Sequence, residues 1–195
     1  MAEIQNMIVA ITGASGAIYG IKLLQVLRKC GVQTHLVISK AGRLTIEHET
    51  EHSFDEVVQM ADHYYHNNDI SVCLASGSCK MSGMIIAPCT VKSLAEIACG
   101  ISSSLISRSA DVMLKERRKL VLLVRETPLH LGHIQNMERV TQMGAIVMPT
   151  VVTLYIKPAS IEEMLEHQVG RVLDLFGIES GLVRHWKGLG DSSKS

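Results

Sequence analysis

Short apolar runs alternate with segments of helical periodicity along most of this chain. The runs have the length and the continuous apolar character of strands that are buried on both faces of a sheet. They lie at residues 7–11, 34–38, 84–87, 120–124 and 145–148. Apolar residues recur at helical spacing in residues 17–30, 39–51, 53–61, 94–98, 108–115, 133–143 and 161–176.

This alternation indicates the fold class. Parallel strands in one sheet need a crossover connection, which is usually a helix. We therefore predict an α/β fold with a doubly wound parallel sheet, in a flavodoxin-like or Rossmann-like three-layer sandwich. The length of 195 residues suits one domain. We expect a single domain over residues 1–186 and a flexible C-terminal tail at residues 187–195, which is rich in Gly and Ser.

One long segment departs from the alternation. Residues 62–82 are rich in His, Asn, Ser and Gly. They predict a long loop with one short strand at residues 70–74. Long loops in compact domains are often functional.

The turn after the first apolar run has the composition of an anion-binding site. Its sequence, residues 12–16, is Thr-Gly-Ala-Ser-Gly, and helical spacing begins directly after it. The first N–H groups of a helix have no intrahelical partners and lie at the positive end of the helix dipole. Gly13 and Gly16 allow close approach, and Ser15 suits a helix cap or a hydroxyl donor to a ligand. The turn predicts a phosphate-bearing ligand, the alternative being a turn that merely packs a helix on a strand.

The spacing of the glycines bears on which ligand this is. Gly13, Gly16 and Gly20 do not form the G-x-G-x-x-G pattern of dinucleotide folds. The second predicted strand ends in Ser39-Lys40, where an NAD site needs an acidic residue for the ribose. The pattern therefore disfavours a dinucleotide and favours a mononucleotide such as FMN.

Further polar turns follow the other predicted strands. Ser39 follows the second run, Thr90 to Ser93 follow the third, and Arg125-Glu126 follow the fourth. Ligands of open parallel sheets bind outside the carboxyl ends of the strands. We expect these turns to lie at one edge of the sheet and to form one site with the first turn.

Charge and targeting signals restrict the classes of partner. Lys plus Arg and Asp plus Glu are equal at 19 each, so no overall field attracts nucleic acid or an acidic membrane surface. The N-terminus has no basic region, and no apolar run approaches the roughly 18 residues of a membrane span. We expect a cytoplasmic protein that binds neither nucleic acid nor membrane.

The cysteines and two neighbouring histidines bear on whether the protein binds a metal. The five cysteines are never spaced as C-x-x-C, which favours reduced thiols, with Cys89 a packed one, over a zinc site. His130 and His133 lack a third ligand, so we expect no metal.

Hydrophobic residues make up 47% of the chain but aromatic residues only 4%. Part of this apolar surface is expected in subunit contacts, in a homo-oligomer.

Six ordered motifs resemble those of one known family, the UbiX-type flavin prenyltransferases. They are Thr-Gly-Ala-Ser-Gly-Ala from Thr12, Ile-Ser-Lys from Ile38, Ala-Pro-Cys-Thr from Ala87, Arg-Ser-Ala-Asp-Val-Met-Leu-Lys-Glu from Arg108, Arg-Glu-Thr-Pro-Leu from Arg125, and Met-Gly-Ala-Ile-Val-Met-Pro from Met143. The resemblance spans Ile8 to about Trp186. It implies transfer of a dimethylallyl group from dimethylallyl phosphate to reduced FMN, without a metal. It also implies a homododecamer and a product that is passed to a UbiD-type aromatic acid decarboxylase.

The resemblance also implies roles for individual residues. The implied FMN-binding positions are Gly13, Ala14, Ser15, Ser39, Thr90, Val91, Lys92, Ser93, Arg108 and Arg125. The implied positions for dimethylallyl phosphate are Tyr155, Arg171 and Lys115. The implied catalytic positions are Ser15, Glu49, Lys115, Glu126 and Trp186. Two segments depart from the family pattern: Ser103-Ser104 replaces Asn-Asn, and residues 149–155 replace a proline-rich stretch that shapes the donor pocket.

These residue types suit the chemistry. Breaking an allylic C–O bond leaves negative charge on phosphate, which Arg171, Lys115 and Tyr155 can meet. The cationic allyl fragment is stabilised by a π face such as that of Trp186. Ring closure at flavin C6 requires removal of a proton, by Glu49 or by the departing phosphate.

Each of these side chains also has an ordinary structural explanation. Glu49 lies in a charged run that is typical of a solvated helix face. Lys115 suits the C-terminal end of a helix, and Arg171 suits the surface of an amphipathic one. Tyr155 suits half-buried packing, and Trp186 an anchor for the tail.

Two other functions compete with prenyl transfer. The first is an FMN-dependent cysteine decarboxylase of the phosphopantothenoylcysteine type, which carries an Asn in the turn after the middle strand and a catalytic His. Residues 90–93 contain no Asn. The second is a non-catalytic flavin carrier of a decarboxylase complex.

Overall fold

The computed structural model describes residues 5–186 and 188. The chain divides into two compact units, Met1–Val151 (unit 1) and Val152–Ser195 (unit 2). The single domain over residues 1–186 stays a prediction. The tail at residues 187–195 lies, apart from residue 188, outside the described residues.

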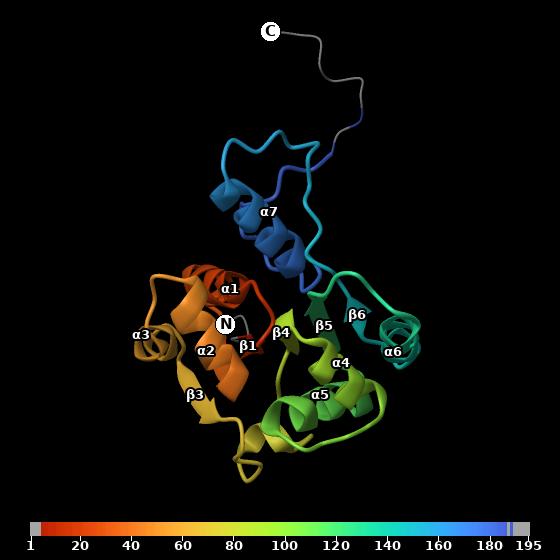
Figure 1. The fold of residues 1–195 in the computed structure, drawn as a ribbon. Helices are drawn as coiled ribbons and strands as arrows, with labels where there is room; N and C mark the ends of the chain where they lie inside the picture. The colour runs from red at the N-terminus through yellow and green to blue at the C-terminus, as the bar shows by residue number, and fades with distance from the viewer. Residues whose placement is uncertain (1–4, 187, 189–195) are drawn as a thin grey trace, which may run out of the picture. The chain divides into compact units, whose positions relative to one another are not determined.

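Within the described residues, unit 1 is built on one sheet of six parallel strands (Figure 1). The strands are β1 (Asn6–Ile11), β2 (Gln33–Ile38), β3 (His63–His66), β4 (Gly83–Cys89), β5 (Lys119–Val124) and β6 (Ile146–Val147). Their order is β3-β2-β1-β4-β5-β6. The chain progresses outward from β1 in one direction and then from β4 in the other, so the order reverses between β1 and β4. The predicted doubly wound fold is confirmed.

Helices connect the strands. In unit 1 the described α-helices are α1 (Ala17–Lys29), α2 (Lys40–Glu49), α3 (Phe54–Gln59), α4 (Val91–Ala98), α5 (Leu105–Lys115) and α6 (Leu131–Gln142). A short 3-10 helix, η1, spans Cys73–Ala75. None of the described helices has both the length and the apolar character that crossing a membrane requires.

Alternate residues of each strand point to opposite faces of the sheet. Ile8 and Ala10 of β1 belong to a buried cluster with α4, α5 and α6. Ile11 faces α1, where Gly20 lies so close that an added Cβ would be 2.5 Å from the carbonyl oxygen of Ala87. Only glycine allows the helix to approach the sheet this closely.

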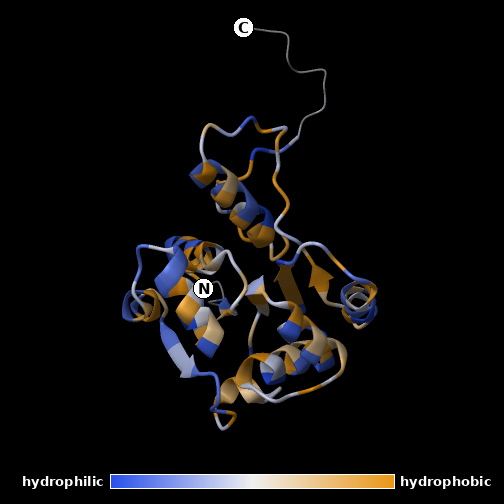
Figure 2. Ribbon diagram, viewed as in Figure 1, coloured by the Kyte–Doolittle hydropathy of each residue, from blue (hydrophilic) through white to orange (hydrophobic). Residues whose placement is uncertain are grey.

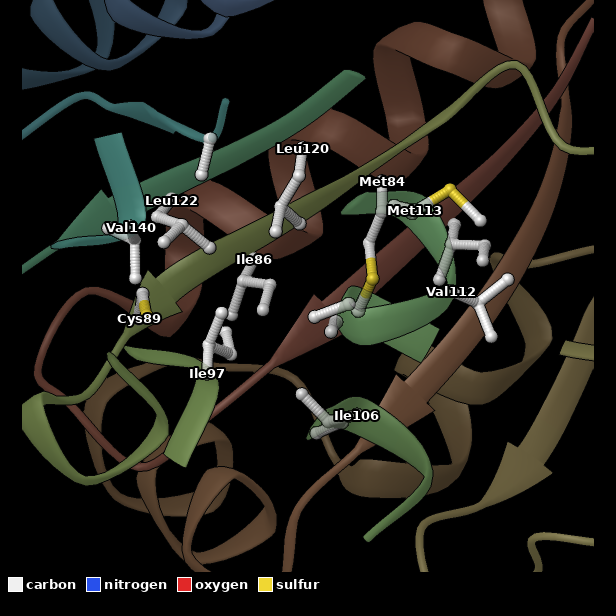
Figure 3. Packing of buried hydrophobic residues seen from close by; sticks show 14 of the residues in the cluster. Met84, Ile86, Cys89, Ile97, Ile106, Val112, Met113, Leu120, Leu122 and Val140 are labelled. Atoms are coloured by element: carbon white, nitrogen blue, oxygen red, sulfur yellow. The ribbon is translucent and has the colours of Figure 1, made fainter. Parts of the chain in front are cut away.

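Figure 3 shows the cluster between the sheet and α4, α5 and α6. Ile86 of β4 lies near Ile97 of α4, Cys89 of β4 lies near Val140 of α6, and Met84 of β4 lies near Met113 of α5 (Figure 3). A fully buried aliphatic side chain contributes about 1.5–3 kcal/mol. Tertiary packing of this kind, rather than helix propensity, supplies most of the stability of helices as short as α4.

Polar caps fix where the helices begin. The side chains of Ser39, Ser53, Thr90, Ser104 and Ser160 each accept a hydrogen bond from an N–H in the first turn of the following helix. Such a cap is worth about 1 kcal/mol. Ser53 and Glu56 form a capping box at the start of α3.

The structure corrects the prediction for residues 62–82. The strand in this segment is β3, and the predicted strand at residues 70–74 is wrong. Figure 2 shows β3 in the blue of polar residues, whereas β5 and β6 are orange. An edge strand needs only one partner strand, here β2, and its side chains need not be apolar on both faces.

Unit 2 contains one described helix, α7 (Ile161–Asp174), and the segment that follows it. A Cβ added to Gly170 would be 2.7 Å from Val183 Cγ2, so the C-terminal segment lies directly on the helix. Arg184 donates to the carbonyl oxygen of Ile156 at 3.2 Å and pairs with Glu163. These contacts hold Ile156 and residues 183–184 against α7.

Candidate active site

A cavity of about 860 Å³ lies at the carboxyl edge of the sheet in unit 1. Its walls come from the segments that follow β1, β2, β3 and β4, and so it sits where the strand order reverses. The lining residues are Thr12, Gly13, Ile38, Ser39, Lys40, Ala41, Arg43, Leu44, Phe54, Tyr64, His66, Asn67, Asn68, Thr90, Lys92, Ser93, Glu96, Ser103, Ser104 and Ile106.

Thr12 joins the two central turns of this edge. Its hydroxyl donates to the carbonyl oxygen of Pro88 at 2.7 Å and accepts from the N–H of Thr90 at 2.9 Å. The residue is 2% exposed. The end of β1 and the start of α4 are therefore fixed to one another by a buried hydroxyl with both roles satisfied.

Gly13 and Gly42 let the turn after β1 touch the first turn of α2. A Cβ on Gly13 would collide with Ala41. A Cβ on Gly42 would be 2.5 Å from the carbonyl oxygen of Ile11. The rim of the cavity is therefore made of closely packed backbone, as a ligand with a phosphate tail requires.

The start of α1 differs from the prediction. Its N-cap is Gly16, at φ 105°, and within the described residues no side chain caps the helix from that position. Of the two roles predicted for Ser15, the N-cap position belongs to Gly16 instead, and the role of hydroxyl donor to a ligand stays a prediction. Instead, the N–H of Gly16 donates to Glu49 Oε2 at 2.7 Å. A carboxylate from the end of α2 thus occupies the positive end of the α1 dipole.

Two other helix starts open on the cavity. Ser39 begins α2 and accepts from the N–H of Gly42 at 3.0 Å. Thr90 begins α4, accepts from the N–H of Ser93 at 3.1 Å and donates to Ser93 Oγ at 3.0 Å. Both starts place hydroxyls and a positive dipole end at the lining, where anions are stabilised.

Charged side chains add to this field. Lys40, Arg43 and Lys92 line the cavity together with one carboxylate, that of Glu96. Lys92 Nζ lies 3.6 Å from Glu96 Oε1, which also accepts from the hydroxyl of Ser103 at 3.1 Å. The lining thus carries more positive than negative side chains and favours an anionic ligand.

An aromatic wall closes the β3 side. The guanidinium of Arg43 lies 4.5 Å above the ring centre of Phe54, and Phe54 meets Tyr64 edge to face at 5.7 Å. Burial raises the pKa of the Tyr64 hydroxyl above its ordinary value, so Tyr64 stays protonated at neutral pH.

Asn67 holds the floor of the cavity to α5. Its carbonyl oxygen accepts from the N–H of Leu105 at 2.7 Å, and its Oδ1 accepts from the N–H of Ile106 at 3.2 Å. The loop after β3 and the first turn of α5 are therefore one rigid assembly.

Several predicted residues lie outside this lining. Among the residues that the structure describes, the lining includes Gly13, Ser39, Thr90, Lys92 and Ser93, but not Ala14, Ser15, Val91, Arg108, Arg125, Lys115, Glu49 or Glu126. Ser15, Arg125 and Glu126 are exposed. The N–H of Arg125 donates to the carbonyl oxygen of Cys89 at 3.1 Å, so this turn adjoins the turn after β4. The roles of these residues stay predictions.

Arg108 and Lys115 contact the segment around η1. Arg108 Nε donates to the carbonyl oxygen of Ala75 at 3.1 Å, and its Nη1 to Asp111 at 2.7 Å. Lys115 pairs with Glu116 at the end of α5, just before β5 begins. Lys115 therefore lies toward the amino end of the strands, away from the cavity in its own chain.

Two of the three predicted donor-binding residues, Tyr155 and Arg171, lie in unit 2 together with Trp186. The rings of Tyr155 and Trp186 meet edge to face at 5.6 Å, and both side chains are about half exposed. Tyr155 also meets His167 of α7, at 5.9 Å between ring centres. Arg171 lies one helical turn beyond His167 and bonds Asp174 at 2.9 Å. Tyr155 and Trp186 are thus brought together, with a cation on the same face of α7 as His167.

Thiol and metal chemistry find no support among the described residues. Cys89 is fully buried, which raises the pKa of its thiol to about 12 and makes it a packed side chain. No group of three or more His, Cys, Asp or Glu side chains within the described residues is arranged to hold a metal ion. His130 caps α6 by accepting from the N–H of Gly132.

A parallel sheet with a hydroxyl- and cation-lined cavity at its switch point defines a nucleotide-binding α/β protein. The Flavoprotein family model matches residues 1–174. A probable UbiX-like flavin prenyltransferase of Bacillus subtilis is 49% identical over 94% of this chain and 90% of its own length. The crystal structure of AnUbiX (PadA1) with FMN and dimethylallyl pyrophosphate superposes with a TM-score of 0.94, at 47% identity over 95% of this chain and 99% of that one.

A dodecameric FMN-dependent UbiX-like decarboxylase of Escherichia coli O157:H7 superposes with a TM-score of 0.92, at 43% identity over 94% of this chain and 100% of that one. The chain belongs to the Flavoprotein family and, within it, to the UbiX-type flavin prenyltransferases. The family resemblance in the six motifs is confirmed.

Three of the lining residues that sequence reasoning missed share one cause. Tyr64, His66 and Asn67 lie in or next to β3, which the apolar pattern did not reveal. Phe54 begins α3 and contacts Tyr64. A correct prediction of β3 would have identified His66 and Asn67 as candidates. His66 ends this parallel strand at the cavity edge, and Asn67 follows it. Glu96 and Ser103 had no comparable signal.

Proposed function

We propose that this protein transfers a dimethylallyl group from dimethylallyl phosphate to N5 and C6 of reduced FMN. The observation that carries the proposal is the likeness, at 47% identity over 95% of the chain, to a protein solved with FMN and dimethylallyl pyrophosphate. The flavin prenyltransferase name of the Bacillus subtilis relative supports it.

The cavity of unit 1 fits FMN. Its volume of about 860 Å³ lies within the range of small-molecule sites. Ser39, Thr90 and Ser93 offer hydroxyls for the ribityl phosphate, and Lys40 and Arg43 offer positive charge. Reduced FMN, when bound, supplies the nucleophilic N5 and C6 atoms.

Donor activation falls to the residues of unit 2 and to Lys115. As the allylic C–O bond breaks, the electron pair leaves with the phosphate oxygen, and Arg171 and Tyr155 stabilise this charge by hydrogen bonds. Trp186 is 58% exposed and offers a π face to the allyl cation, an interaction of about 2 kcal/mol when desolvated.

Glu49 is the proposed base. Its Oε2 accepts from the N–H of Gly16, which fixes the carboxylate beside the turn after β1. Oε1 is the proposed acceptor of the proton that ring closure releases. Ser15, next to Gly16, is proposed to position or relay protons, and Glu126 and Arg125 to complete the flavin edge.

The proposal also includes the donor, the assembly, the location and the protein that receives the product. We assign the monophosphate as the donor, a homododecamer as the assembly, the cytoplasm as the location and a UbiD-type aromatic acid decarboxylase as the acceptor of the product. The dodecameric neighbour from Escherichia coli O157:H7 supports an oligomer.

The direct test is anaerobic incubation of the protein with reduced FMN and either dimethylallyl phosphate or dimethylallyl pyrophosphate. We expect mass spectrometry to find a flavin heavier by one C5H8 unit, formed faster with the monophosphate. A flavin of unchanged mass with both donors contradicts the proposal and favours a flavin carrier.

Arg171→Ala tests the division of labour within the proposal. Loss of a charged hydrogen-bond donor to phosphate is expected to weaken donor binding about tenfold to a hundredfold. FMN retention, measured by absorbance after gel filtration, is expected to stay intact. Arg139→Ala, on α6, is the control. Loss of FMN from Arg171→Ala overturns the assignment of Arg171 to the donor.

A further inference from the structure

His167 of α7 is a buried histidine in contact with a proposed donor-binding residue. It is 2% exposed, and its Nε2 lies 3.4 Å from the hydroxyl oxygen of Tyr155. The two rings are edge to face, with an interplanar angle of 86°. Trp186 meets the same tyrosine at an interplanar angle of 76°. Tyr155 is thus held by two aromatic rings and one polar atom.

The other ring nitrogen of His167 decides the tautomer. Nδ1 is buried and has no hydrogen-bond partner within the described residues. A buried N–H without an acceptor is costlier and rarer than an acceptor without a donor. The proton of the neutral ring therefore belongs on Nε2, next to Tyr155, and Nδ1 keeps its lone pair.

The charges around His167 keep the ring neutral. Burial lowers the pKa of His167 below its ordinary value, and the Arg171 guanidinium one turn along α7 lowers it further. Arg184 and His185 from the C-terminal segment act in the same direction, while Asp174 opposes them. At neutral pH the imidazole is therefore an uncharged donor at Nε2.

We propose that His167 is a positioning residue for prenyl transfer, which donates Nε2–H to the Tyr155 hydroxyl oxygen and so directs the Tyr155 O–H toward the phosphate of the donor. The inference rests on the proposed function, because it takes Tyr155 as a donor ligand. A tyrosine hydroxyl can accept one hydrogen bond and donate another. With its oxygen engaged by His167, the phenol proton is free to bond an anionic oxygen, and the bond is strengthened because the two hydrogen bonds polarise one another.

Three substitutions of His167 distinguish a hydrogen bond to Tyr155 from simple packing against its ring. In His167→Gln the amide nitrogen takes the place of Nε2, whereas in His167→Asn it takes the place of Nδ1. His167→Phe keeps a ring against Tyr155 but has no donor. Replacing a buried polar group by an apolar one of similar shape is often nearly neutral for stability, so all three variants can be compared as folded proteins.

We expect the donor KM of His167→Phe and His167→Asn to rise about tenfold, the equivalent of one hydrogen bond. His167→Gln is expected to stay within about threefold of the parent chain. FMN affinity is expected to be equal in all of them. His185→Phe, which replaces an exposed histidine of the same unit, is the control. Equal donor KM values for His167→Phe and His167→Gln overturn the proposal.

A second measurement does not depend on activity. Nitrogen-15 NMR of the histidine side chains distinguishes the two neutral tautomers, and the His167 signal is identified by its absence in His167→Gln. We expect the Nε2–H tautomer at pH 7.5. The Nδ1–H tautomer overturns the inference even if prenyl transfer is observed. Conversely, if the parent chain makes no prenylated flavin, the proposed function fails while the tautomer still decides the His167–Tyr155 hydrogen bond.

Discussion

The turn after β1 and the turn after β4 lie side by side at the carboxyl edge of the sheet, yet their helices begin differently. Thr90 caps α4 with its own hydroxyl. At α1 the N-cap is Gly16, and the acceptor for its N–H comes from Glu49, which lies 33 residues away in the sequence. The start of α4 remains open to an anion at the cavity, whereas the start of α1 already holds a carboxylate. A glycine-rich turn is thus not by itself the anion site.

The two turns therefore have different roles, one in proposed ligand binding and the other in packing and in positioning Glu49. Proposed ligand binding falls to α2 and α4, whose first turns line the cavity. The turn after β1 supplies close packing through Gly13 and a fixed position for the proposed base, Glu49. Thr12 then joins the two turns.

The largest expected effect comes from Glu49→Gln. The amide oxygen of Gln can still accept from the Gly16 N–H, but the side chain can no longer take up a proton. We expect turnover to fall about a hundredfold or more, the usual range for a lost general base. The free energy of unfolding is expected to fall by about 0.3–1 kcal/mol, because the neutral amide loses the charge–dipole interaction with α1, and FMN retention is expected to be unchanged. If turnover stays normal in Glu49→Gln, the departing phosphate is the base.

Thr12→Val tests the link between the turns. The valine side chain leaves the Thr90 N–H without its buried partner, while the Pro88 carbonyl keeps the hydrogen bond from the backbone N–H of residue 12 at 3.3 Å. We expect a loss of about 1–3 kcal/mol in the free energy of unfolding, measured by urea denaturation, and weaker FMN retention. Thr12→Ser retains the hydroxyl and is expected to restore most of both. Wild-type stability in Thr12→Val shows that the two turns are held together by other contacts.

A smaller effect distinguishes the caps themselves. Thr90→Ala removes a cap and is expected to cost about 1 kcal/mol of stability. Ser15→Ala, at an exposed position that does not cap α1, is expected to change stability by less than about 0.5 kcal/mol. Urea denaturation of both variants measures the difference. Equal losses contradict the assignment of Gly16 and Glu49 as the start of α1.

Acidic pH is expected to destabilise the whole protein through a group that lies outside the two turns. His35 of β2 is 6% exposed, and burial, followed by the neighbouring His63, lowers its pKa to about 4. Between pH 6.5 and 4 the unfolded chain therefore binds more protons at this site than the folded chain. The free energy of unfolding falls as the pH drops through this range.

Urea denaturation at several pH values checks this, with His35→Gln as the variant that lacks the titrating ring. We expect the fall in stability from pH 6.5 to 4 to be shallower in His35→Gln than in the parent chain. Equal slopes in the two proteins contradict a buried neutral His35. The comparison of caps is best made above pH 6.5.

The apolar pattern predicted the doubly wound sheet because four of its strands are short, buried runs, β6 is a short, partly buried one, and helices lie between them. β3 was not predicted because His63–His66 is a polar edge strand. The apolar residues of segment 70–74, where a strand was predicted, form a bend and the short η1 helix. Local patterns locate helix starts, so Ser39 and Thr90 were predicted as polar turn residues. The Glu49–Gly16 and Tyr155–His167 contacts join distant positions, for which one sequence holds no signal.

Asn67 sets a limit on how this protein can vary. Its two oxygens hold the first amides of α5, so Asn67, which directly follows β3, has a fixed position. Asn68 still lines the cavity, and the chain is then mostly exposed until η1 begins at Cys73. Between β3 and η1, insertions and deletions are therefore best tolerated after Asn68, and a relative that gains or loses residues there keeps the same binding chamber.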